Sequence, residues 1–190
     1  MQKPIATTRS ATGIPTGRLA IWWVLASEVV IFGGLLASYL MFRLGHPEWA
    51  NAAAVTNTYI GAFNTFVLLS SSFTAVLAHQ AAENGDGKQA ARYLMMTIAG
   101  ALIFLIVKGF EWTSEISHGY TITANGFWSF YYTAAGLHAA HVIAGAIIMG
   151  FIAVDAAKGK ELQRVELIGI YWHFVDVVWI FLFPLLYIAK

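Results

Sequence analysis

Cysteine is absent from this chain of 190 residues. Disulfide bonds, thiolate metal sites and cysteine-linked haem are therefore excluded. Any metal ion would need histidine or carboxylate ligands.

Charge is also scarce. Only 11% of the residues are charged, whereas 58% are hydrophobic and 15% are aromatic. This balance lies far outside that of a soluble domain and indicates an integral membrane protein. The formal net charge is +1 and no basic run is present, so nothing predicts a nucleic-acid partner.

The apolar residues are gathered into runs long enough to cross a hydrocarbon core of about 30 Å as helices. We predict an all-α fold: a polytopic bundle of five transmembrane helices in a membrane domain at 19–190, preceded by a polar tail at 1–18. The predicted helices span about 19–42, 55–78, 93–112, 127–154 and 167–189. The run at Asn84-Gly85-Asp86-Gly87 predicts a turn between the second and third helices.

Lysine and arginine are distributed unevenly between the two sides of this bundle. Eight of them lie in the tail and in the connections after the second and fourth helices, whereas only Arg43 and Lys190 lie opposite. Basic residues are enriched on the cytoplasmic side of membrane proteins. We therefore expect the N-terminus in the cytoplasm and the C-terminus outside.

The last apolar run contains His173 and Asp176, three residues apart. At that spacing both side chains lie on one face of a helix and share a polar environment. An ionisable group at membrane depth costs about 2.5–3.5 kcal/mol or more and rarely faces lipid. This face of the helix is therefore predicted to pack against protein.

Ionisable residues also lie within other runs. Glu28 is nine residues into the first run, about 14 Å along a helix and near the midplane. Lys108 and Glu111 are spaced for an ion pair near the end of the third run, and His138 and His141 are three apart in the fourth. We expect these polar faces to converge inside the bundle.

Two interpretations of these residues compete. The histidines His138, His141 and His173, with Asp176, Glu28 and Glu111, could supply nitrogen and oxygen ligands to a metal. However, metal-binding histidines normally need a carboxylate partner for each ring, so we predict no bound metal. For His138 and His141 we favour structural hydrogen bonds to neighbouring helices or a position near a polar loop. Glu28 is either a neutral acid that donates a hydrogen bond or a functional proton or lipid site, and both readings stay open.

Small and aromatic residues are expected to shape the packing. Aromatic side chains near the predicted helix ends are typical of interfacial anchors: Trp22, Trp23, Trp112, Trp128 and Tyr187. Glycines let membrane helices approach closely: Gly33, Gly34, Gly100, Gly136, Gly145 and Gly150. The run Ser70-Ser71-Ser72 is predicted to hold helices together.

The longest specific motif is Trp172-His173-Phe174-Val175-Asp176-Val177-Val178-Trp179, preceded by Glu166 and Tyr171. It resembles the last-helix signature of subunit III of the haem–copper respiratory oxidases. Further similar segments are Ser27-Glu28, Asn64-Thr65, Glu111-Trp112 and Gly136-Leu137-His138 with His141. The resemblance extends from about Leu19 to Tyr187, and the five predicted helices match a short bacterial form that lacks the usual first two of seven.

The resemblance implies a non-catalytic accessory subunit of a proton-pumping terminal oxidase in a bacterial plasma membrane. Such a subunit packs on subunit I, with subunit II and a small subunit IV as further partners. It binds phospholipid and supports proton uptake and stability during turnover. Haem and copper would belong to partner subunits, with no cofactor, metal or catalytic centre in this chain. Glu28 and Tyr171 favour cytochrome c as the electron donor.

The resemblance also suggests roles for individual residues. Glu28 corresponds to a buried functional acid near a lipid or oxygen route. The structural polar network, or lipid contact, would comprise Glu111, His138, His141, Glu166, His173 and Asp176. Because two helices are missing, the family's lipid cleft would be closed here by another subunit or be open.

Other functions share some of these features. A related accessory protein of a nitric oxide reductase or a quinol oxidase would have similar helices. A stand-alone proton-coupled transporter would also place ionisable groups in several helices, but this sequence has no inverted-repeat character.

Overall fold

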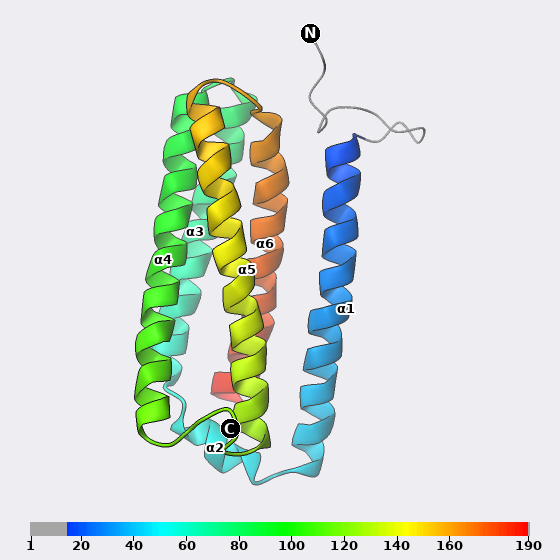
Figure 1. Ribbon diagram of the computed structural model, residues 1–190, viewed down its shortest axis with the longest axis vertical. Coiled ribbons are helices and arrows are strands. Elements are labelled where there is room, and N and C mark those ends of the chain that lie inside the picture. Colours follow the sequence, from blue (N-terminus) through cyan, green and yellow to red (C-terminus); the bar gives the residue numbers. More distant parts are fainter. Residues whose placement is uncertain (1–14, 190) are drawn as a thin grey trace.

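The computed structural model describes residues 15–189. These form helices α1 (Thr16–Gly45), α2 (Trp49–Val55), α3 (Thr58–Glu83), α4 (Gly87–Ser117), α5 (Gly126–Ala157) and α6 (Gln163–Phe183), and a π-helical turn, η2 (Pro184–Ile188). Five long helices lie side by side, and short α2 crosses one end (Figure 1). Each long helix is apolar and long enough to cross a bilayer, which confirms the all-α, five-span prediction.

The helix boundaries follow from local side-chain caps. Asn57 caps α3 through the backbone N–H groups of Tyr59 and Ile60, and Asn125 caps α5 through that of Trp128. Between α3 and α4, the predicted turn is present: Gly85 has φ of +78°, and Asp86 Oδ1 accepts from the Gln89 N–H at 2.9 Å. These caps satisfy backbone donors that would otherwise be unpaired at the helix ends.

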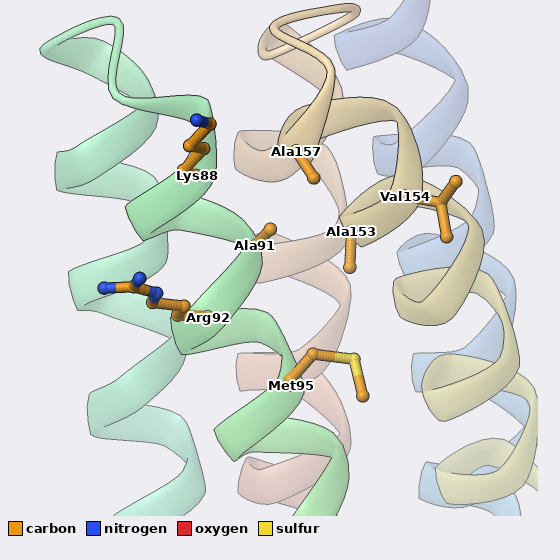
Figure 2. A pocket seen from close by; sticks show the side chains of 7 residues that line it. All are labelled: Lys88, Ala91, Arg92, Met95, Ala153, Val154 and Ala157. Carbon is orange, nitrogen blue, oxygen red and sulfur yellow. The ribbon is translucent and has the colours of Figure 1, made fainter.

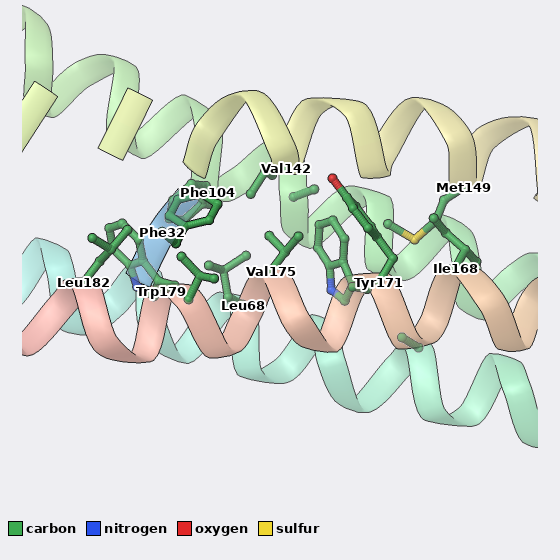
Figure 3. Packing of buried hydrophobic residues seen from close by; sticks show 14 of the residues in the cluster. Phe32, Leu68, Phe104, Val142, Met149, Ile168, Tyr171, Val175, Trp179 and Leu182 are labelled. Carbon is green, nitrogen blue, oxygen red and sulfur yellow. The ribbon is translucent and has the colours of Figure 1, made fainter. Parts of the chain in front are cut away.

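The core is formed where α6 meets α3, α4 and α5. Tyr171, Val175, Trp179 and Leu182 project from α6 toward the neighbouring helices (Figure 3). The largest side chains with almost no exposure are Trp128, Trp172, Trp179, Tyr131, Tyr187 and Phe104. Trp128 and Tyr187 are therefore core residues, and their predicted role as interfacial anchors is wrong. Trp22 and Trp23 are 62% and 70% exposed, consistent with that role.

Close approach between helices occurs at some of the predicted glycines. A Cβ atom at Gly100 would lie 2.7 Å from Ser71 Cβ, and one at Gly145 would lie 3.1 Å from the Trp172 ring. Gly33, Gly34 and Gly150 have no such neighbour within 4 Å. Only the first two of these positions therefore let helices of this chain pack closely.

Helix α1 stands apart from the other four along much of its length (Figure 1). Only 11% of its most apolar stretch is buried, compared with 50% for the span formed by α6 and η2. The first residues of α1 and the last residues of η2 lie at opposite ends of the bundle (Figure 1), as an odd number of crossings requires.

Candidate functional site

One polar cluster joins α1 to α5 near the middle of the bundle. Glu28 Oε2 lies 3.0 Å from His141 Nε2, and the two side chains are 15% and 18% exposed. The Nδ1 atom of His141 lies 2.8 Å from the Leu137 carbonyl oxygen. Because a carbonyl can only accept, Nδ1 carries a hydrogen, and Nε2 faces Glu28. The two groups can therefore share a single proton between the carboxyl and the ring, although Oε2 lacks the alignment of a full hydrogen bond.

The surroundings of this pair are largely apolar. The Phe32 ring meets the His141 ring edge-on at 5.3 Å, and the Tyr171 hydroxyl donates to the His141 carbonyl at 3.2 Å. Between α1, α5 and α6 lies a cavity of about 520 Å³ whose walls include Val24, Ile148 and Tyr171, with Arg164 among the lining residues. Tyr171 borders both this cavity and the pair.

The last-helix motif does not form a catalytic set but binds α3. Trp172 Nε1 donates to Ser71 Oγ at 3.1 Å, and His173 Nδ1 lies 2.6 Å from Ser72 Oγ. Asp176 is buried beside the same Ser72, without a hydrogen bond of ordinary geometry. The prediction that His173 and Asp176 share one polar, protein-facing environment is confirmed. The predicted packing role of the serine run is confirmed for Ser71 and Ser72, but it is wrong for Ser70, which is exposed and bonds within α3.

His138 and His141 are not brought together by their spacing. His138 is fully buried, stacks on the Trp179 ring at 5.1 Å and meets Phe104 edge-on at 5.5 Å. Neither of its ring nitrogens has a hydrogen-bond partner among the described residues. The expected hydrogen bond from His138 to a neighbouring helix is therefore not formed, and the two rings face different sets of helices.

A second polar cluster surrounds Lys108 near the other end of the bundle. Its buried ammonium group donates to Glu111 Oε2 at 3.0 Å and to the Tyr131 hydroxyl at 3.1 Å, and also to the Tyr187 hydroxyl. It lies 4.9–5.6 Å from the ring centres of Tyr131, Tyr187, Trp179 and Trp112. The predicted ion pair is confirmed, and aromatic faces add electrostatic stabilisation to the buried cation.

Glu115 extends this cluster toward the surface. Its oxygens accept from the hydroxyls of Tyr131 at 3.2 Å and Tyr132 at 3.5 Å. An adjoining cavity of about 310 Å³ is lined by Glu111, Glu115 and His118, among others. Sequence reasoning missed Tyr131, Tyr187 and Glu115 in this role. The available signal was the spacing of Glu115 in the last turn of α4 and His118, its C-cap residue, three positions later.

Glu166 is separate from both clusters. It pairs with Arg18 at 2.6 Å, with side-chain exposures of 27% for Glu166 and 53% for Arg18. Outside the spanning helices, Glu48 accepts from His46 at 2.8 Å. Its own backbone N–H and the His46 side chain lower the pKa of the Glu48 carboxyl.

Among residues 15–189, no three histidine, cysteine, aspartate or glutamate side chains are placed to hold one metal ion. The candidate ligands are divided between separate helix interfaces. The chain's own polar residues therefore suit proton sharing and helix packing, and the prediction that it carries no metal stays a prediction.

Comparison with known proteins places these features in a family. The profile of the family described as cytochrome c oxidase subunit III matches residues 7–190. The chain belongs to the cytochrome c oxidase subunit III family. It is 35% identical over 173 residues to the cytochrome c oxidase subunit 3 of Corynebacterium diphtheriae, covering 87% of this chain and 84% of that protein. It is 34% identical to that of Thermostichus vulcanus, covering 86% and 83% respectively.

A third relative has a different organisation. The haem–copper oxidase subunit I+III of Aeropyrum pernix is 30% identical over 183 residues, which cover 90% of this chain but 22% of that protein. Family membership makes this chain a subunit III of the haem–copper oxidase type, and its five long apolar helices make it a multi-pass membrane protein.

Proposed function

We propose that this chain is a non-catalytic accessory subunit of a proton-pumping terminal oxidase with cytochrome c as donor, in a bacterial plasma membrane. It packs on subunit I, binds phospholipid and supports proton uptake and durability during turnover. Subunit II and a small subunit IV are further partners. The haems and copper belong to partner subunits, and this chain makes no transition-state contact.

The observation that carries this proposal is family membership together with the Aeropyrum pernix relative, whose name joins subunits I and III in one chain. Fusion of two subunits favours a direct contact between them. Helix α1 offers a suitable surface, since Trp22, Val29 and Val30 are 57–74% exposed on it. An apolar face of this kind requires lipid or another membrane helix against it.

The contribution to proton uptake rests on Glu28 and His141. Removing a carboxylate and an imidazolium from water costs a large desolvation free energy, whereas removing a neutral carboxyl and a neutral imidazole that share one proton costs much less. The pair therefore holds one proton that can shift between the carboxyl and the ring with little movement of either side chain, and this proton is the proposed link to proton uptake. The cavity between α1, α5 and α6 lies beside Tyr171 and is the proposed place for a lipid chain near this pair.

The test is oxygen consumption against time, for intact complex and for complex depleted of this chain, at matched haem concentration. An accessory role predicts that the depleted complex keeps most of its initial rate and then loses activity progressively over successive turnovers. Immediate and complete loss of the initial rate, with unchanged subunit I spectra, would place this chain in the catalytic path and contradict the proposal.

A further inference from the structure

A second groove, on the opposite side of α5 from the Glu28 interface, is separate from the cavity between α1, α5 and α6 that is proposed above for a lipid chain. It lies between the first turns of α4 and the last turns of α5 (Figure 2). Its volume is about 440 Å³, and it is lined by Lys88, Ala91, Arg92, Met95, Ala153, Val154 and Ala157.

The groove follows from side-chain size. Gly87 brings the two helices into contact, because a Cβ atom there would lie 2.0 Å from the Ala156 carbonyl oxygen. Next to this contact the lining contains three alanines, which leave an open apolar channel between the helices. Met95, 55% exposed, lies at its deeper end in Figure 2 and can adapt its shape to a flexible occupant.

Two basic side chains of α4, Lys88 and Arg92, line one edge of this channel. Lys88 and Arg92 are both exposed, and within residues 15–189 neither has a protein partner for its charge. They are four residues apart, about 6 Å along the helix axis, and Lys88 directly follows the first residue of α4. In Figure 2 the Arg92 side chain points sideways from α4 and away from α5. Because both cations are exposed, their long side chains can turn toward a ligand at the rim.

The charges around the groove indicate that its ligand is an anion. The nearest carboxylate in sequence, Asp86, is engaged in capping α4, and Asp155 pairs with Arg164 at 3.7 Å. The rim therefore presents unpaired positive charge above an apolar channel at the level of a helix end. Basic pockets of this kind between transmembrane helices bind anionic lipid headgroups.

We propose that this α4–α5 groove is a binding site for one anionic diacyl phospholipid. Lys88 and Arg92 contact the phosphate and headgroup, and an acyl chain runs along Ala91, Val154 and Met95. The proposal requires only that the chain spans a membrane, so it stands or fails separately from the role of Glu28 and from the accessory function.

The test uses the intact oxidase complex in nanodiscs with a photoactivatable phosphatidylglycerol, and in parallel with the matching phosphatidylcholine probe. Cross-linked peptides are mapped by mass spectrometry. We expect the phosphatidylglycerol probe to label residues 88–95 and 153–157 in preference to the phosphatidylcholine probe. Each cation near the surface contributes about 1 kcal/mol, or roughly a fivefold preference, so Lys88→Gln with Arg92→Gln should lower the preference about 25-fold.

The matched control is Lys158→Gln with Lys160→Gln, which removes the same charge from the same end of the bundle outside the groove. It should leave the preference within about twofold, since these lysines do not line the groove. Ala157→Trp should block labelling by both probes, because Ala157 lines the groove yet is exposed.

Three outcomes would overturn the proposal: equal labelling by the two probes in the unaltered complex, equal loss of preference in the control variant, and absence of labelling because a helix of another subunit covers the groove. The accessory function would survive each of them.

Discussion

At the scale of single residues, the polar groups of the bundle interior divide into those that share a partner and those that stand alone. Glu28 and His141 meet at 3.0 Å, and Lys108 is surrounded by a carboxylate and phenols. Sequence spacing predicted that Lys108 lies beside Glu111 and that His173 lies beside Asp176, because the two members of each pair belong to the same helix. The spacing could not predict the contact between Glu28 and His141, because that contact depends on how α1 packs against α5.

The shared proton of the Glu28–His141 pair leads to a spectroscopic prediction. A neutral pair requires a protonated carboxyl at neutral pH, so infrared difference spectra of unaltered complex against Glu28→Gln should contain a carboxylic acid C=O band. His141→Asn should shift that band, because the polar atom that lies 3.0 Å from the Glu28 carboxyl changes. A carboxylate band alone would contradict the neutral pair.

Removal of Lys108 should be among the most damaging single changes. Lys108→Met leaves Glu111 buried without its cation, and breaking a buried pair costs about 3–5 kcal/mol. The double variant Lys108→Met with Glu111→Gln should recover part of that loss, since it leaves no unpaired charge. The measurement is the thermal midpoint at which the subunit dissociates from the complex. Equal midpoints for the single and double variants would show that the two groups are not coupled.

At the scale of helices, the α3–α6 interface explains why the last apolar run tolerates polar residues. Polar atoms of α6 contact hydroxyl groups on α3. Ser71 contacts Trp172, Ser72 contacts His173, and Thr65 contacts Trp179. The sequence predicted that this face packs against protein, because the period of a helix fixes which side chains share a face. The identity of the partner helix could not be predicted, since any of the other spans offers polar atoms.

Ser71→Ala and Ser70→Ala form a matched pair for this interface. Ser71 accepts from Trp172 across the helices, whereas the exposed Ser70 donates to Phe66 of its own helix. Interhelical hydrogen bonds in membranes are worth about 0.6 kcal/mol on average and up to about 1.7. Ser71→Ala should therefore lower the dissociation midpoint measurably, and Ser70→Ala should not. An equal effect of the two substitutions would argue against the interface bond.

Helix boundaries were predicted less well than helix number. The helices extend beyond the apolar runs, since α4 continues to Ser117 and α3 to Glu83, and the added turns contain polar residues. Helix α2 (Trp49–Val55) was missed because it lies almost entirely between the helices predicted at 19–42 and 55–78. Apolarity reports the hydrocarbon core, whereas caps such as Asp86 and Asn125 set where helices begin.

At the scale of the whole molecule, the four-helix core of α3–α6 carries most of the packing, and α1 is tied to it at separated points. Near the basic end the tie is Arg18 with Glu166. Near the opposite end the Tyr39 hydroxyl donates to the Leu185 carbonyl at 3.0 Å. The resemblance predicted Glu166 as part of an internal network, but its partner lies at the surface.

Loss of the Arg18–Glu166 pair should therefore have a small effect. Exposed ion pairs contribute about 0.2–1 kcal/mol and are screened by salt. Glu166→Gln should lower the dissociation midpoint slightly at low salt and not at high salt. A large loss that is independent of salt would show that Glu166 is buried against another subunit in the complex.

The position of α1 also has a consequence for the order of events during synthesis. Glu28 and His141 are 113 residues apart in sequence, the difference between their residue numbers. Chains elongate at about 5–20 residues per second, so α1 emerges roughly 6–23 seconds before its partner on α5 exists. For that interval Glu28 has no histidine to meet, and a nascent first helix with a lone acid must be sheltered by another protein or wait as a neutral acid in lipid.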